Sequence, residues 1–118
     1  MNLGYWFGMM ILSIVKIAPP PEQRNEVLSI LRSIRGPIQA ISGCLDCSIC
    51  EVEGEEGEVL FLEHWQSWES FMRHIRSDIY GRLLRAMDLS RHEPDVSFFE
   101  VSELRGMEIL KAVRERRV

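Results

Sequence analysis

Apolar residues follow a strand pattern in four segments of the chain. The first segment, MMILSIVKI, is apolar on both faces of an extended strand, which is typical of a central strand covered on two sides. The other three combine β-branched, aromatic and leucine residues and are bounded by glycine, proline or polar breaks. We therefore predict strands at 9–17, 44–53, 58–66 and 96–101.

Between the first and second predicted strands, apolar residues recur at the spacing of a helix. This helix is expected to begin after the three prolines at 19–21 and to stop at Gly36-Pro37, because glycine and proline both end helices. Its predicted buried side consists of Val27, Ile30, Leu31 and Ile34.

A second helical region follows the third strand. Ser67 is expected to cap a helix, and Ser77 is expected to cap a further helical piece. The apolar side of the first piece is predicted to contain Trp68, Phe71, Met72 and Ile75. Pro94 breaks the chain before the fourth strand, and a last helix is expected at 107–116.

The order βαββαβ, followed by a terminal helix, predicts an α+β fold of the ferredoxin-like type. In this fold one antiparallel four-stranded sheet carries its helices on one face. The other face would be a large apolar patch, because the first strand is apolar on both sides and Phe98 and Phe99 point in opposite directions. We expect a twofold homodimer that buries this face, sheet against sheet. The predicted units are a leader at 1–8, the domain at 9–103 and a helical tail at 104–118.

Composition narrows the class of protein further. The chain has 118 residues, enough for one domain, and its net charge of −4 argues against a nucleic-acid partner. The apolar run at 3–15 is shorter than the roughly 20 residues that span a bilayer. We therefore expect no membrane partner and a cytoplasmic protein, in which thiols stay reduced.

Cys44, Cys47 and Cys50 form a CxxCxxC run within the second predicted strand. Alternation along a strand would place Cys44 and Cys50 on one side and Cys47 on the other, together with Leu45 and Ile49. A fourth cysteine is missing and the run does not lie in a loop, so we expect no metal site. Cys47 is interpreted as a small buried hydrophobic residue.

The segment EHWQSWESFMRHIRSDIY carries a more specific pattern, together with the GCL sequence that opens the second strand. It contains a Glu-x-Trp strand end, a serine and an aromatic residue at a helix start, a histidine, and a second serine followed by an aromatic residue. These are Glu63, Trp65, Ser67, Phe71, His74, Ser77 and Tyr80. Over residues 9–103 the chain resembles the antibiotic biosynthesis monooxygenase family of dimeric α+β barrels.

The resemblance implies a homodimer with a small hydrophobic pocket in each subunit, between sheet and helices. Oxygenases of the family oxidise aromatic phenols or quinols without a metal or flavin, so no cofactor is expected. By resemblance, Trp65 and His74 are the candidate catalytic residues, with Trp65 as a stacking wall and His74 as a base. The candidate substrate-binding residues are Glu63, Phe71, Tyr80 and Ser13. Haem-degrading relatives need an asparagine on the first strand, which this chain lacks.

Other interpretations of the same residues remain open. Trp65 can be a packing residue of the core or interface. His74 lies off the predicted apolar side of its helix, so it could face solvent or the sheet edge, or it could be a structural histidine paired with Glu63. At the level of the whole protein, the alternatives are a binding or sensing module without turnover and, less favoured, a thiol-dependent redox or metal protein.

Overall fold

The elements follow the predicted order in the structure, a computed structural model that describes residues 9–54 and 56–115. The predicted leader at 1–8 lies outside the described residues, and the division into units stays a prediction. The elements are β1 (Met10–Ile17), η2 (Pro21–Gln23), α1 (Arg24–Gln39), β2 (Cys44–Glu51), β3 (Val59–Trp65), α2 (Trp68–Ile75), α3 (Asp78–Asp88), β4 (Asp95–Val101) and α4 (Gly106–Glu115).

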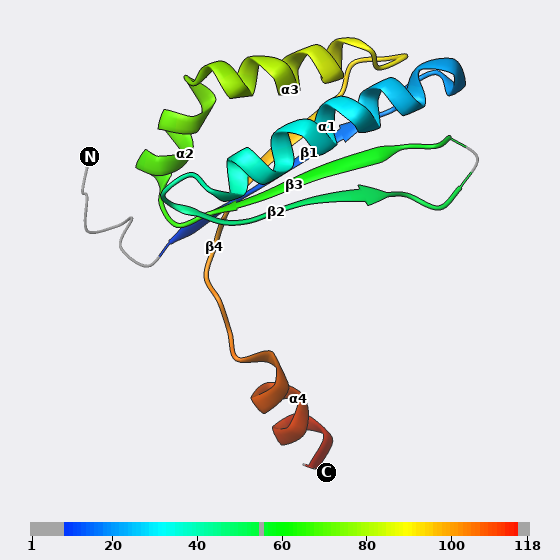
Figure 1. Cartoon of the computed structure of the whole chain (residues 1–118). Helices are drawn as coiled ribbons and strands as arrows, with labels where there is room; N and C mark the ends of the chain where they lie inside the picture. The colour runs from blue at the N-terminus through cyan, green and yellow to red at the C-terminus, as the bar shows by residue number, and fades with distance from the viewer. Residues whose placement is uncertain (1–8, 55, 116–118) are drawn as a thin grey trace.

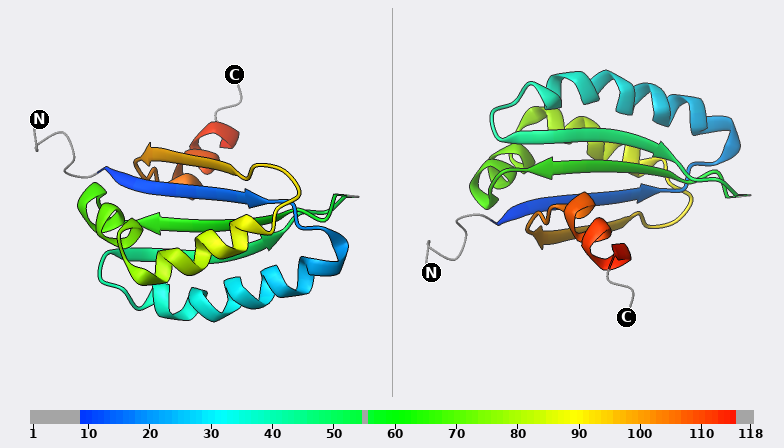
Figure 2. Two further views of the ribbon diagram at one scale, coloured as in Figure 1. Left: turned by 90° about the horizontal axis from the view of Figure 1, so that it is seen from above. Right: turned by 90° about the horizontal axis from the view of Figure 1, so that it is seen from below.

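The four strands form one antiparallel sheet in the order β2-β3-β1-β4. Helices α1, α2 and α3 all lie on one face of this sheet (Figure 1), and both views in Figure 2 show the same layering. This arrangement confirms the predicted ferredoxin-like α+β fold. Because β1 pairs with both β3 and β4, it is a central strand, as its two apolar faces predict.

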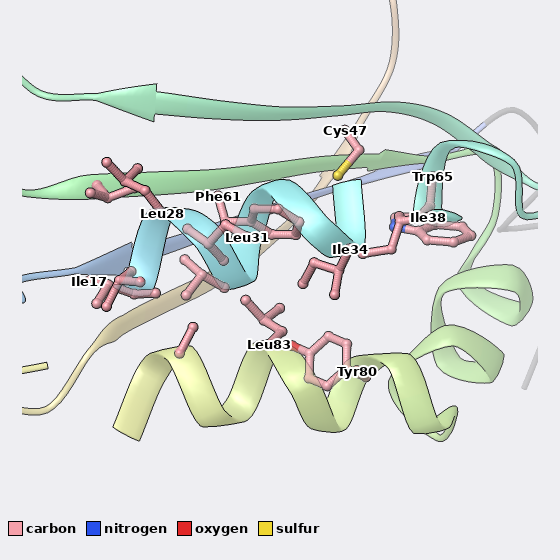
Figure 3. Close-up of a cluster of buried hydrophobic side chains, with 14 of the residues drawn as sticks. Ile17, Leu28, Leu31, Ile34, Ile38, Cys47, Phe61, Trp65, Tyr80 and Leu83 are labelled. Carbon is pink, nitrogen blue, oxygen red and sulfur yellow. The ribbon is translucent and has the colours of Figure 1, made fainter. Parts of the chain in front are cut away.

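The core lies between the helices and the sheet (Figure 3). Burial along β1 and β3 alternates strictly, since every second side chain points to the helices. Phe61 and Trp65 of β3 pack there, with Leu31 and Ile34 of α1 and Leu83 of α3, and all five are inaccessible to solvent. Burial of such side chains contributes on the order of 1.5–3 kcal/mol each.

Helix α1 does not stop at Gly36-Pro37 as predicted but continues to Gln39. The prediction is wrong because Ile38 is completely buried, and the packing of this side chain favours one more helical turn. Pro37 itself is exposed and lies in the last turn, where the missing N–H removes only one helical hydrogen bond. The amide of Ala40 closes the helix on the carbonyl of Gly36 at 3.2 Å.

The predicted alternation of the cysteines is also wrong at one end of β2. A bulge lies between Cys44 and Asp46, so that Cys44 pairs with Trp65 while Cys47 pairs with Glu63. Cys44 and Cys47 therefore point to the same, helix-covered side, and Leu45 is 49% exposed instead of buried. The burial of Cys47 is confirmed.

The face of the sheet opposite α1–α3 is called the open face below. It is less covered than the face on which these helices lie. Its side chains alternate with the buried ones and include Leu12 and Ile14 of β1, Leu60 and Leu62 of β3, and Phe99 of β4. Those of β1 and β3 are partly exposed, and Phe99 is 47% exposed. Among the described residues, none of the helices is long and apolar enough to cross a membrane.

Candidate functional site

A carboxylate, an indole and an imidazole meet at the corner between β3 and α2. Glu63 and Trp65 are alternate residues of β3 and therefore point to the same side, towards the helices. Glu63 Oε1 accepts a hydrogen bond from Trp65 Nε1 at 3.1 Å and lies 2.7 Å from Nε2 of His74. The imidazole and the carboxylate are fully buried, so their contact forms in a region of low dielectric constant.

Helix α2 begins at a cap on Ser67 and brings His74, in its last turn, to this corner. Ser67 is extended and its hydroxyl accepts a hydrogen bond from the amide of Ser70 at 3.2 Å, which confirms the predicted cap. Ser77 occupies the cap position of α3, but its hydroxyl donates to the carbonyl of His74 at 2.6 Å instead of capping α3. This hydrogen bond joins the end of α2 to the start of α3.

Gly43 allows the loop before β2 to approach α2 closely. Its φ angle is +94°, and a Cβ at this position would lie 2.5 Å from Cβ of Ser70. The carbonyl of Gly43 also accepts a hydrogen bond from the amide of Gln66 at 2.8 Å. Only glycine combines this backbone angle with this approach, so Gly43 fixes the corner geometrically.

The expected position of His74 off the buried side of α2 is wrong, whereas the alternative of a histidine paired with Glu63 agrees with the structure. The buried residues of this helix are Ser70, Phe71 and His74, while Trp68, Met72 and Ile75 are only partly buried. The buried side of α2 is thus rotated about the helix axis, away from the side that its apolar residues alone would predict. The buried carboxylate of Glu63 explains this turn, because it gives the imidazole a partner inside the protein.

Aromatic rings enclose the imidazole. The ring of His74 stacks on Trp65 at 4.6 Å between centroids, and Tyr80 contacts it edge-on at 5.3 Å. Phe71 lies 6.3 Å from Trp65 and packs edge-on against Phe98 of β4 at 4.9 Å. A planar aromatic lining with one proton-accepting ring is suited to binding an aromatic compound that carries an acidic hydroxyl.

Several polar atoms in this corner have no hydrogen-bond partner among the described residues. These atoms are Ser13 Oγ, Glu63 Oε2 and His74 Nδ1. His74 Nε2 is close enough to Glu63 for an ion pair, but its direction does not make a well-formed hydrogen bond. Ser13 pairs with Glu63 across the β1–β3 ladder, so both side chains face the helices side by side. Each unpaired buried group costs about 1–3 kcal/mol, which makes such a cluster unusual in a purely structural core.

The same carboxylate acts on its titratable neighbours. Burial, followed by the charge of Glu63, raises the pKa of Tyr80 to about 12 and that of Cys44 to about 11. Burial and Glu63 raise the pKa of Cys47 as well. The phenol and these two thiols are therefore protonated at neutral pH. No cluster of three or more His, Cys, Asp or Glu residues in the described part of the chain could hold a metal ion.

The six residues expected from sequence lie together in space. Trp65, His74, Phe71 and Tyr80 form one chain of ring contacts, Glu63 joins Trp65 and His74, and Ser13 faces the same side from β1. Their roles in binding and catalysis stay predictions. Sequence reasoning missed Phe98 and Gly43. The alternation of β4 against Ser13 could have indicated Phe98. Gly43 belongs to the GCL sequence of the family pattern, but that pattern does not indicate its approach to Ser70.

The antiparallel sheet with its helices on one face defines a ferredoxin-like α+β protein, and the corner of Glu63, Trp65 and His74 lies between sheet and helices. The chain belongs to the antibiotic biosynthesis monooxygenase family, whose sequence model matches residues 10–86. The match includes every residue of the corner except Phe98.

Solved structures of similar proteins support the fold. A candidate antibiotic biosynthesis monooxygenase from Caulobacter crescentus is 20% identical, with a TM-score of 0.74 over 85% of this chain and 96% of that one. Rv0793 from Mycobacterium tuberculosis is 20% identical, with a TM-score of 0.73 over 81% and 98%. Another antibiotic biosynthesis monooxygenase is 18% identical, with a TM-score of 0.70 over 79% and 99%. A search of curated proteins found no match. At these identities the likeness concerns the fold alone.

Proposed function

We propose that this protein is a cofactor-independent monooxygenase that oxidises a small aromatic substrate of the quinol or anthrone type. Membership of the antibiotic biosynthesis monooxygenase family supports the general function. For an anthrone, the reaction converts a ring CH₂ group and O₂ into a carbonyl group and water, and a quinol reacts in the same way through its keto tautomer. One oxygen atom enters the substrate, and the other leaves as water with the two hydrogens of the substrate. The substrate itself supplies the electrons, so neither a metal nor a flavin takes part.

In this proposal His74 removes a proton from the substrate. The resulting anion is electron-rich enough to pass an electron to O₂, and proton removal by a positioned base contributes about 10²–10⁴-fold to a rate. Glu63, 2.7 Å from the imidazole, stabilises the positive charge that His74 acquires. Trp65 and Phe71 supply flat apolar walls, and the hydroxyls of Ser13 and Tyr80 are available to the oxygens of the substrate.

The observation that carries the proposal is the group of unpaired polar atoms on Ser13, Glu63 and His74. They lie on three separate elements and face one aromatic corner, as a site for a polar aromatic ligand requires. Glu63 and Ser13 are completely buried, and His74 is 2% exposed. A substrate must therefore displace the two-turn helix α2, which is linked to its neighbours by short segments at 66–67 and 76–77.

The proposed assembly is a cytoplasmic homodimer in which two open faces pack together. The apolar side chains of the open face are only partly covered in one subunit, and patches of this kind mark interfaces. Each subunit would then hold its own corner on the helix side, away from the contact between the sheets.

Oxygen consumption with a panel of hydroquinones and anthrones tests the proposal. We expect turnover by the wild type and a loss of about 100-fold or more in kcat for His74→Gln, which keeps a polar side chain of similar size. His92→Gln is the matched control, because His92 is exposed and in a loop. Absence of turnover with every compound, or equal rates for the two variants, would contradict the proposed chemistry.

The second candidate is a binding or sensing module that uses the same corner without turnover. The complete burial of Glu63 and Trp65 favours it, because a ligand held beside them would be shielded from solvent. Saturable quenching of tryptophan fluorescence by the same compounds, without oxygen consumption, would support this function over the first.

A further inference from the structure

Exposed apolar side chains gather at the C-terminal end of the chain. Of the eleven large hydrophobic residues described as exposed, eight fall within residues 96–113. They are Val96, Phe98, Phe99, Leu104, Met107, Ile109, Leu110 and Val113. Most of the large hydrophobic residues described as exposed thus belong to β4 and to the segment that follows it.

Helix α4 has a clear apolar side, and none of its residues is buried in its own subunit. At 100° per residue, Ile109, Leu110 and Val113 share one side, while Glu108 and Lys111 lie on the other. All ten residues of the helix are exposed, and Leu110 and Val113 are 54% and 65% exposed. A helix of this length is only marginally stable in water by itself, so it needs a surface to pack on.

Helix α4 cannot pack on the helix-covered side of its own sheet, because it points to the opposite side. The chain leaves the end of β4, passes through residues 102–105 and carries α4 away from the sheet on the side of the open face (Figure 1). The view from below shows α4 in front of the open face near β1 and β4 (Figure 2). The ion pair between Arg105 and Glu108, at 3.3 Å, is local to the segment.

We propose that α4 packs on a second copy of this chain and that the two copies exchange their terminal helices. The inference rests on the homodimer of the proposed function. When two sheets pack face to face they lie about 10 Å apart, and a helix that projects from the open-face side then extends alongside the other subunit. The open face and α4 are thus two parts of one interface. A twofold axis gives each subunit the helix of the other.

Two neighbouring substitutions on opposite sides of α4 test this packing. Leu110→Ser removes an apolar side chain, and Lys111→Ser is the matched control, because leucine and lysine have similar helix propensities. Burial of one leucine strengthens an association by about tenfold or more, and the dimer contains two such residues. We therefore expect Leu110→Ser to weaken dimerisation by about 100-fold or more, and Lys111→Ser by less than about threefold, in sedimentation equilibrium. Equal effects of the two substitutions would overturn the inference.

Hydrogen exchange as a function of concentration distinguishes exchange between copies from packing within one subunit. We expect the amides of α4 to become protected at the concentration at which the wild-type chain dimerises. Protection of α4 in dilute monomer, or its absence in the dimer, would overturn the inference, and so would a chain that stays monomeric at every concentration. None of these measurements uses turnover, so failure of the proposed oxygenase chemistry is detected separately.

Discussion

Replacement of Glu63 by glutamine is the most direct perturbation of the buried corner. The substitution keeps the size of the side chain and leaves a carbonyl oxygen that can still accept the hydrogen bond from Trp65. It removes the negative charge that lies 2.7 Å from His74 Nε2. Both partners are shielded completely from solvent, so water cannot replace the lost interaction.

The expected cost follows from this burial. Removing one member of a buried pair destabilises proteins by about 3–5 kcal/mol, and the preserved size of glutamine places Glu63→Gln near the lower end, at about 3 kcal/mol. Glu58→Gln is the control within the same hairpin. Glu58 pairs with Lys16 at 3.6 Å in a partly exposed position, where such a pair is worth at most about 1 kcal/mol.

Urea denaturation of both variants at neutral pH measures the two free energies of unfolding, provided that the slopes of the transitions are equal. A loss for Glu63→Gln no larger than that for Glu58→Gln would refute the reasoning. It would mean that the charge at position 63 does not hold the imidazole, and the role of Glu63 in the proposed reaction would fall with it.

Three further predictions concern the surroundings of this corner. Gly43→Ala should lower the free energy of unfolding by about 2 kcal/mol or more in urea denaturation, because Gly43 has a φ of +94° and a Cβ there would lie 2.5 Å from Ser70 Cβ. Adding Ser70→Gly should restore only part of this loss, because the backbone strain remains. The pKa of Tyr80 is raised to about 12, against 10 in the unfolded chain, so its contribution to the free energy of unfolding is fully present below pH 10. About 2–3 kcal/mol of this free energy should be lost as the pH rises from 10 to 12. Tyr80→Phe should not show this part of the decrease. Cys47 is buried and burial raises its pKa, so iodoacetamide should modify Cys47 only on unfolding, as peptide mass spectrometry would show.

The hydrophobic pattern predicted the elements of the fold because each one follows a local periodicity. The strict alternation in β1 and β3 and the cap at Ser67 are properties of a few consecutive residues, and the structure contains them. The end of α1 was misplaced because the burial of Ile38 depends on the sheet beneath it, which outweighs the local signal of Pro37. The bulge in β2 likewise depends on its pairing with β3, and no residue of the CxxCxxC run indicates it.

The candidate site shows the same division between local and long-range information. Glu63 and Trp65 could be placed on one side of a strand by counting, but the burial of His74 could not, because its partner is a carboxylate on another element. An apolar stripe predicts a buried helix side only when the core beneath it is itself apolar. Here the core contains a charge, and the helix turns its histidine towards it.

That buried charge also relates the stability of the corner to its proposed chemistry. Burial, followed by the charge of Glu63, raises the pKa of Tyr80 and of Cys47, so these groups near His74 stay neutral. A neutral and largely apolar lining leaves the carboxylate as the main charge that a protonated imidazole meets. The unpaired atoms of Ser13 and Glu63 weaken the fold at this point, and a substrate that hydrogen-bonds to them would recover the loss on binding. The unpaired polar groups that destabilise this corner in the unliganded protein are therefore the groups that a polar aromatic ligand would stabilise on binding.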